Sequence, residues 1–479
     1  MEKTKVITSL AYKFIERFAV KGLGIIISII LARMLAPSDF GQVAILTVFI
    51  DISLVIVQGG LNTALVQNKH VTDIEYSTVF YLSLSVAIGL IIILFCSAPI
   101  IAGYYNDNGL VLPLRVYSVS LIFGAFNSVQ IAKLQREMRF KELMICSLIV
   151  TVLSGITGIA LAFLGYGIWA LILYFLSSSV LNCIIMLVVC NWRPKAIFSK
   201  NRAKDLFSFG WKMLASAIIC SLYSNIRSLI IGKVFSPSDL GFFNRGQQLP
   251  SVVSTTLDSS IQSVMLPVMS FEQDNLDKLS LVLRRSVTLG TYLVFPAMVG
   301  LAAVSTPLVT VLLTEKWLPC VVYMQIIAIA EMNVPISTSN LTVIKATGRS
   351  DIHLKLEVIR RSAMFIVLIL SVVMFRSVLA ITVGYLISAI IDVIIVAYPV
   401  KKIIGYGLVD ELSDIWKTLV ASIVMGLLVL YIGTIDINIY ISLVFQITAG
   451  VLCYLLLSVV MHIEAFNYAL STFKGFIRK

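Results

Sequence analysis

Charged side chains are scarce in this sequence. Only 13% of its 479 residues are aspartate, glutamate, lysine or arginine, whereas a soluble domain is about a quarter charged. No hydrophilic stretch is long enough to form a soluble catalytic domain. Hydrophobic residues make up 59% of the chain, and the mean hydropathy is +0.97. The apolar runs are long enough to cross a bilayer, so the sequence predicts an all-α protein with many membrane spans.

Patterns that bind metals or nucleotides are also missing. The chain has seven cysteines and three histidines, and none of them has the spacing of a metal site or a CxxC redox motif. The glycines do not form a phosphate loop between a strand and a helix. The sequence therefore predicts no metal site, no nucleotide hydrolysis and no enzyme activity, and most cysteines are expected to be apolar packing residues.

About 14 transmembrane helices are expected from windows of roughly 20 apolar residues. The expected spans are 14–36, 42–65, 76–101, 112–132, 143–164, 168–190, 210–235, 242–268, 286–313, 319–344, 360–375, 378–399, 415–433 and 438–461. With an even number of spans, both termini lie on the same side of the membrane.

The basic residues indicate which side that is. All but seven of the 37 lysines and arginines lie at the termini, in the loops on the terminal side or in the adjoining parts of the spans. This asymmetry predicts cytoplasmic termini, and it explains the net charge of +12 without a nucleic-acid partner. All five tryptophans fall near expected span ends, as in an interfacial aromatic belt.

An internal repeat divides the chain. The sequence ARMLAPSDFG at Ala32–Gly41 returns as GKVFSPSDLG at Gly232–Gly241, and Asn127 has a counterpart in Asn333. Six spans per copy give parallel rather than inverted repeats, an arrangement known from transporters. The predicted domains are a first six-helix lobe at 1–200, a second at 201–400, and two additional transmembrane helices at 401–479.

The repeated Pro-Ser-Asp segment is predicted to be a tight turn between two spans. Pro37 and Pro237 would stop one helix, and the serine and aspartate that follow would cap the next. A direct contact with substrate is the less favoured interpretation.

Longer stretches carry a resemblance to a known family. The segments ILARMLAPSDFGQVAIL (30–46), GGLNTALVQNKHVTDIEYSTVF (59–80) and FFNRGQQLPSVVSTTLDSSIQSVMLPVMS (242–270) resemble bacterial Wzx-like polysaccharide flippases. These proteins form the polysaccharide-transport branch of the multidrug/oligosaccharidyl-lipid/polysaccharide exporter superfamily. The similarity is greatest to exporters of the colanic-acid and teichuronic-acid type, and it covers both lobes.

The resemblance implies a function, a substrate and a location. It implies two lobes in a V arrangement that flip an undecaprenyl-diphosphate-linked oligosaccharide by alternating access across the bacterial cytoplasmic membrane. The product would be polymerised into capsule, exopolysaccharide or O-antigen, with a polymerase and a chain-length regulator as possible partners besides membrane lipids. It implies no cofactor beyond a proton or sodium gradient.

Basic residues within spans are candidates for binding the diphosphate, because charges inside a membrane are costly. Lys21 lies in the first span of the first lobe and Arg227 in the first span of the second, and together they could bind the diphosphate between them. Arg33 and Arg245 lie near outer span ends, where snorkelling to lipid headgroups explains them equally well. A structural ion pair is the alternative for Lys21 and Arg227.

Acidic and amide residues within spans are further candidates. Asp51, Asp258 and Glu331 could bind a proton or Na⁺, or could neutralise a basic partner. Amides could bind sugar hydroxyls or simply join helices, and this set comprises Gln58, Asn62, Asn127, Gln130, Asn225, Gln262, Asn333 and Asn340.

Two other functions are compatible with parts of this pattern. An ion-coupled small-molecule or multidrug antiporter would share the architecture, but it would need an acidic and aromatic cavity for organic cations. A membrane-embedded polymerase or glycosyltransferase would need polar catalytic groups in large external loops. The external loops here are short and hold few carboxylates.

Overall fold

The computed structural model describes residues 3–60, 62, 65 and 71–467, and this part of the chain consists of helices joined by short connections. Twelve helices in it are long and apolar enough to cross a membrane. They coincide with twelve of the expected spans. The other two expected spans are helices as well, but they carry more polar residues; these are α1 (Lys3–Met34) and α10 (Pro237–Phe271).

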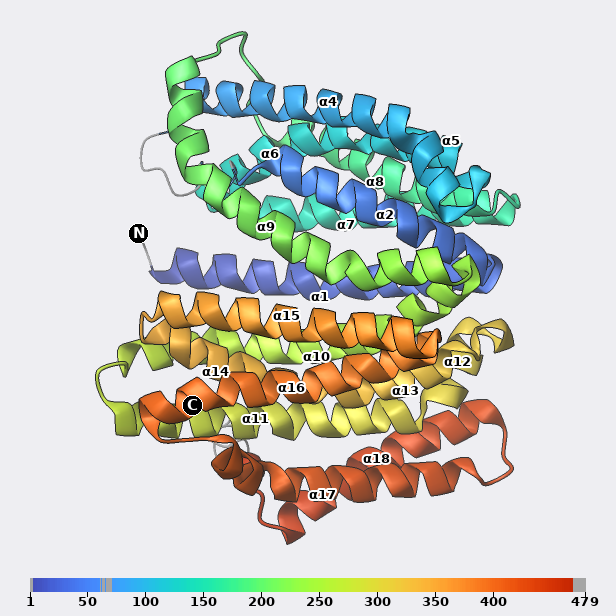
Figure 1. Cartoon of the computed structure of the whole chain (residues 1–479), viewed down its shortest axis with the longest axis vertical. Coiled ribbons are helices and arrows are strands. Elements are labelled where there is room, and N and C mark those ends of the chain that lie inside the picture. Colours follow the sequence, from blue (N-terminus) through green and yellow to red (C-terminus); the bar gives the residue numbers. More distant parts are fainter. Residues whose placement is uncertain (1–2, 61, 63–64, 66–70, 468–479) are drawn as a thin grey trace. The chain divides into compact units, whose positions relative to one another are not determined.

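The chain forms two compact units, residues 1–241 and 242–479. In the first unit α7 packs against α1 and α8, whereas α9 packs against α2 and α4 (Figure 1). Its other helices have these bounds: α2 (Pro37–Gln58), α4 (Asp73–Tyr105), α5 (Val111–Ser118), α6 (Ser120–Arg136), α7 (Phe140–Phe163), α8 (Ile168–Val189) and α9 (Lys200–Val234). The first helix of the second repeat, α9, therefore packs within the unit that holds the first repeat.

In the second unit α11 packs against α13, α14 and α17, and α15 packs against α16. The two helices outside the repeats, α17 and α18, pack against each other and against α11 and α12. The bounds in this unit are α11 (Leu276–Ala303), α12 (Ser305–Leu313), α13 (Cys320–Glu331), α14 (Val334–Ala346), α15 (Ser350–Phe375), α16 (Val378–Ile404), α17 (Leu408–Gly433) and α18 (Ile439–Val460).

Three expected spans are interrupted. The span expected at 112–132 is divided into α5 and α6 at Val119, the one at 286–313 into α11 and α12 at Val304, and the one at 319–344 into α13 and α14 after Glu331. Hydrophobicity alone does not reveal such breaks, because the residues on both sides of each break are apolar enough for a span.

The repeated turn differs in detail from the expectation. Pro37 and Pro237 begin the second helix of each pair rather than end the first, a position where proline costs no hydrogen bond. The carboxylates of Asp39 and Asp239 accept hydrogen bonds from the backbone N–H of residues 36 and 236, at 3.0 and 3.2 Å. The aspartates therefore cap the helix from its third position.

The two copies of the turn also touch each other. A Cβ atom on Gly41 would lie 1.7 Å from the carbonyl oxygen of Pro237, and one on Gly241 would lie 2.2 Å from that of Pro37. Neither distance is possible for a real side chain. The repeated glycine is therefore required at both positions because each copy of the turn packs on the backbone of the other.

Candidate functional site

One face of α10 is polar and exposed. Thr255, Ser259 and Ser263 follow one another at intervals of four residues, and all three are exposed. Their hydroxyl groups donate to carbonyl oxygens one turn earlier in the same helix, which leaves the hydroxyl oxygens free to accept further bonds. We call these three residues the α10 hydroxyl face. A hydroxyl face of this kind within a membrane favours contact with water or a polar ligand over contact with lipid.

An adjacent side of α10 is polar and faces other helices; Ser254 and Asp258 are buried there, and Ser251 and Gln262 are half-buried. Ser251, Ser254, Asp258 and Gln262 face α13 and α14, and we call them the α10 seam. The carboxylate of Glu331, at the end of α13, accepts hydrogen bonds from Ser251 at 3.0 Å and from Ser254. Tyr385 in α16 donates a third bond at 2.9 Å. Glu331 is only 4% exposed, so hydroxyl groups from two helices provide its solvation.

A second buried carboxylate, Asp258, belongs to α10 itself. Asp258 is 6% exposed, and one of its oxygens accepts a hydrogen bond from Thr338 in α14 at 2.7 Å. Gln262 donates to the same oxygen at 3.3 Å and accepts a bond from Thr342 at 2.9 Å. Ser339 extends the network from Gln262 to Ser286 in α11.

The buried carboxylates Asp258 and Glu331 lie in similar environments. Within the described part of the chain, neither Asp258 nor Glu331 forms a salt bridge. Both carboxylates are surrounded by neutral hydroxyl and amide donors. Such a carboxylate can bind a proton or a small cation, since no arginine or lysine already neutralises it.

The four candidate cations lie in different environments. Lys21 in α1 and Arg33 near the end of α1 are exposed, and Arg227 in α9 is half-buried. Arg245 in α10 is 8% exposed, donates to Gln248 at 2.6 Å, and lies over the ring of Trp317 at 5.5 Å. Arg245 is thus enclosed by protein rather than extended toward lipid headgroups.

The clamp predicted for Lys21 and Arg227 remains a prediction. Both residues belong to the first unit, but α1 packs mainly on α7, whereas α9 packs on α2 and α4. Next to Arg227, Asn225 donates to the carbonyl of Ser221 in its own helix at 3.0 Å, and Ser224 is exposed on the same helix.

Asn127 and Asn333 have the same structural role in the two repeats. The amide of Asn127 donates to the carbonyl of Ser179 in α8 at 3.3 Å. The amide of Asn333 donates to the carbonyl of Ala389 in α16, the corresponding helix of the second repeat. Both asparagines therefore join two helices of one lobe. Joining helices was the second of the two roles expected for such amides, besides binding the glycan.

The other polar candidates of the first unit are isolated. Asp51 in α2 is half-buried, and its electrostatic neighbour is Tyr117. Gln58 is exposed at the end of α2. The side-chain oxygens of Asn62 and Gln130 are buried and meet no hydrogen-bond partner among the described residues.

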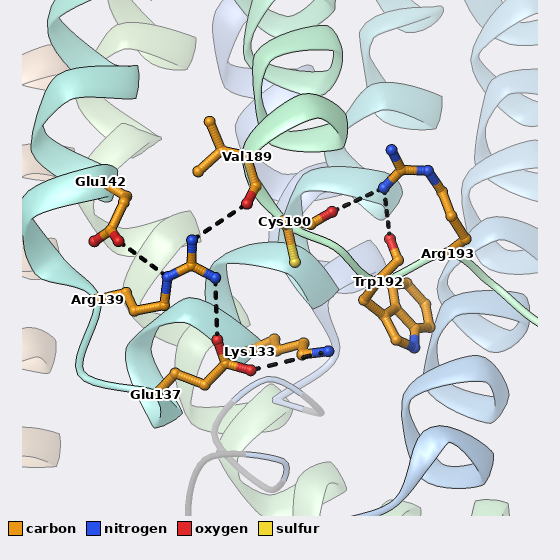
Figure 2. Close-up of polar contacts among 8 residues, drawn as sticks. All are labelled: Lys133, Glu137, Arg139, Glu142, Val189, Cys190, Trp192 and Arg193. Atoms are coloured by element: carbon orange, nitrogen blue, oxygen red, sulfur yellow. Dashed lines mark hydrogen bonds and ion pairs between the residues drawn. The ribbon is translucent and has the colours of Figure 1, made fainter.

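Arginines of the basic loops that are predicted to set the topology form hydrogen bonds and ion pairs within the protein. Arg139 contacts Glu142 at 3.1 Å, Glu137 at 3.3 Å and the carbonyl of Val189 at 3.3 Å (Figure 2). Arg193 donates to the carbonyl groups of Cys190 and Trp192 at the end of α8. These arginines neutralise carboxylates and satisfy a helix C-terminus, so they are less available to a phosphate ligand.

Two buried contacts of acidic residues were not predicted from the sequence. Arg360 in α15 forms a two-pronged ion pair with Asp392 in α16, in which the second contact measures 3.0 Å. Glu411 in α17 lies next to Asn340, and its side chain is 0% exposed. Arg360 and Glu411 fall at the edges of expected spans, where charges are ordinary, so only the helix packing reveals their burial.

Long apolar helices, an internal repeat and polar groups inside the helical units define a multi-pass α-helical membrane protein. Residues 30–322 match the family described as polysaccharide biosynthesis protein, and the chain belongs to this family.

Two named relatives align with this chain over most of its length. The chain is 25% identical to teichuronic acid biosynthesis protein TuaB of Bacillus subtilis, over 86% of each chain. It is 22% identical to lipopolysaccharide biosynthesis protein WzxC of Escherichia coli, over 89% of this chain and 88% of WzxC.

Solved structures share the fold. Lipid II flippase MurJ in an inward closed conformation superposes with a TM-score of 0.79 at 15% identity, over 95% of this chain and 99% of MurJ. An inward-facing multidrug transporter of the MATE family gives a TM-score of 0.60 at 15% identity, over 82% of this chain and 98% of that one. The predicted all-α polytopic fold and the predicted family are therefore confirmed.

Proposed function

We propose that this protein flips an undecaprenyl-diphosphate-linked oligosaccharide from the inner to the outer leaflet of the bacterial cytoplasmic membrane. Membership of the polysaccharide biosynthesis family is the observation that carries this proposal. The relatives named for teichuronic acid and lipopolysaccharide biosynthesis support the substrate class. The fold shared with a lipid II flippase supports the mode of action. The translocated unit would serve capsule, exopolysaccharide or O-antigen synthesis.

The α10 hydroxyl face provides a surface for the glycan. Thr255, Ser259 and Ser263 form a line of exposed hydroxyl groups along a membrane helix. Sugar hydroxyls can donate to these oxygens without any charged group. The diphosphate would be neutralised by Lys21 and Arg227, with arginine providing the better bidentate geometry.

The α10 seam provides the energy coupling in this proposal. Asp258 and Glu331 would take up a proton or Na⁺, and binding would change the packing of α10 on α13 and α14. The hydroxyl face and the seam lie on adjacent sides of the same helix, so a shift of α10 on its neighbours would also move the surface that contacts the glycan. No covalent step is involved, both termini are cytoplasmic, and a polymerase and a chain-length regulator would act on the product.

A deletion strain of the native host tests this function. Loss of the protein is expected to abolish surface polysaccharide and to accumulate the lipid-linked oligosaccharide on the cytoplasmic leaflet. The wild-type gene should reverse both effects, and Arg227→Ala should not. Ser259→Leu, which removes a hydroxyl from the exposed face, should transport more slowly than Ile219→Leu, an exposed apolar exchange on α9.

Normal polysaccharide together with an altered sensitivity to cationic drugs would contradict the proposal and favour a multidrug antiporter. Accumulated lipid-linked oligosaccharide on the outer leaflet would also contradict it, since the defect would then lie in polymerisation.

A further inference from the structure

A carboxyl group and a carboxamide meet in the interior of the second unit, and neither belongs to the α10 seam. Glu411 lies in the first turn of α17, and Asn340 lies in α14 of the second repeat. Both side chains are 0% exposed. The Asn340 amide nitrogen donates to one Glu411 oxygen at 2.6 Å. Ile415, one turn after Glu411, and Leu341, next to Asn340, belong to the same buried apolar cluster.

The pair has too few hydrogens for its acceptors. A carboxamide has two N–H hydrogens, and the Asn340 nitrogen already serves the carbonyl of Ile336 at 3.0 Å and Glu411. The Asn340 oxygen and the second Glu411 oxygen are buried and meet no donor among the described residues. An ionised carboxylate would therefore hold an unpaired oxygen inside an apolar cluster, which is unfavourable.

The charged groups around Glu411 do not compensate for a negative charge. Asp410 and Asp414, on the same helix, are the charges that act on it most strongly, and both are acidic. The nearby cation from α11, Arg284, contacts Asp414 at 2.6 Å. Tyr406, which precedes α17, donates to the other oxygen of Asp414 at 2.8 Å. Burial raises the pKa of Tyr406, so its hydroxyl remains a donor to Asp414.

The other helices around α17 contribute no buried cation. Lys345 of α14 and Lys401 and Lys402 of α16 are exposed. Helix α18 contains no lysine, arginine, aspartate or glutamate. Within the described residues Glu411 forms no salt bridge.

We propose that Glu411 and Asn340 form a proton-binding site that joins the second repeat to the helices outside the repeats. The proton resides on Glu411 and makes it a neutral acid, which supplies the missing donor and removes a buried charge. Loss of this proton leaves a carboxylate without a cation between α14 and α17, so the contact between these helices weakens. The site depends on no particular substrate and can be tested without a transport assay.

Infrared spectroscopy of the purified full-length protein in lipid nanodiscs tests the proton directly. A protonated carboxyl group has a C=O absorption that an ionised one lacks, and this absorption shifts in heavy water. We expect the wild type at neutral pH to show a band that disappears in Glu411→Gln. The band should remain in Glu315→Gln, a matched exchange at an exposed position. Identical spectra for the wild type and Glu411→Gln would mean that Glu411 is ionised and would overturn the proposal.

Stability as a function of pH gives a second readout. If the folded protein holds a proton that the unfolded chain releases at neutral pH, stability falls as pH rises. Glutamine is neutral at every pH and can still accept the bond from Asn340, so Glu411→Gln should fold and should show a flatter pH profile than Glu315→Gln. A pH profile that Glu411→Gln leaves unchanged would contradict proton binding, even if the variant is less stable.

Discussion

The two repeats share a backbone plan but differ in the chemistry of their interiors. In the first repeat α2 and α6 approach so closely that a Cβ on Gly124 would lie 2.5 Å from the side chain of Leu54. In the second repeat the corresponding helices, α10 and α13–α14, are joined by hydrogen bonds to Asp258 and Glu331. Counting from Asn127 and Asn333, the residue of the first repeat that corresponds to Glu331 is Ala125.

The last two helices of each repeat show the same contrast. In the first repeat α7 and α8 meet at Gly158, where a Cβ would lie 2.9 Å from Tyr174, and through a hydroxyl pair of Thr157 and Ser177 at 2.8 Å. In the second repeat α15 and α16 are joined by the Arg360–Asp392 ion pair.

This difference separates residues that shape the fold from residues that distinguish the lobes. The features present in both copies, the glycine of the turn and the asparagine that bonds to a helix carbonyl, fix the backbone. The carboxylates of Asp258 and Glu331 and the Arg360–Asp392 ion pair occur in the second copy, whereas the buried carboxylate described in the first copy, Glu75, lies at the start of α4 and pairs with Arg202. Residues that serve transport are therefore best sought among the polar groups that the repeats do not share.

The largest effect is expected from breaking the ion pair of the second repeat. Arg360→Met should destabilise the protein by about 3–5 kcal/mol, because Asp392 is 5% exposed and would keep a buried charge. Arg360→Met combined with Asp392→Leu should recover most of this loss, since the buried carboxylate is then removed as well, and Glu357 keeps its ion pair with Arg361. Thermal unfolding in detergent measures both. If the double variant is as unstable as the single one, the unpaired charge of Asp392 is not the cause of the loss.

The glycines of the repeated turn should respond alike in both copies. Gly41→Ala and Gly241→Ala each place a methyl group within 2.2 Å of a backbone oxygen, which must move away. We expect a cost of about 3 kcal/mol for each, measured as a lower unfolding temperature and a lower level of protein in membranes. Gly22→Ala is the matched control, because nothing lies within 4 Å of its Cβ position. If only one of the two variants is impaired, the turns are not equivalent.

The acidic residues of the two lobes should differ. Glu331→Gln weakens three hydrogen bonds from hydroxyl groups and should cost about 2 kcal/mol. Asp51→Asn should change stability by less than about 0.5 kcal/mol, because Asp51 is half-buried and accepts no hydrogen bond within the described part of the chain. Unfolding curves of the two purified variants provide the test. Equal losses would mean that the first lobe also has a structured acidic site.

Much of this architecture can be predicted from the sequence, because the apolar runs and the repeat determine it. Each of the 14 expected spans contains a helix, although residues 61, 63 and 64 of the span expected at 42–65 lie outside the described residues. Asp258, Gln262 and Glu331 can be recognised in the sequence because polar groups inside a membrane are costly. The sequence does not show that Glu331 bonds to serines of α10, or that Asp258 and Gln262 bond to α14, since both depend on which face of α10 meets the neighbouring helices. Arg360 and Glu411 were missed for a related reason: hydrophobicity places them at span edges, and only tertiary packing buries them.

The smallest expected effect concerns the asparagine shared by both repeats. Asn127→Leu and Asn333→Leu each remove one hydrogen bond to a helix carbonyl, and each should cost about 1 kcal/mol. Because both bonds join two helices of the same lobe, the losses should be equal and additive in the double variant. Unfolding temperature and surface polysaccharide should be measured together. A transport defect much larger than the loss of stability in Asn333→Leu, but not in Asn127→Leu, would indicate that Asn333 also contacts the glycan and that even this shared feature has diverged.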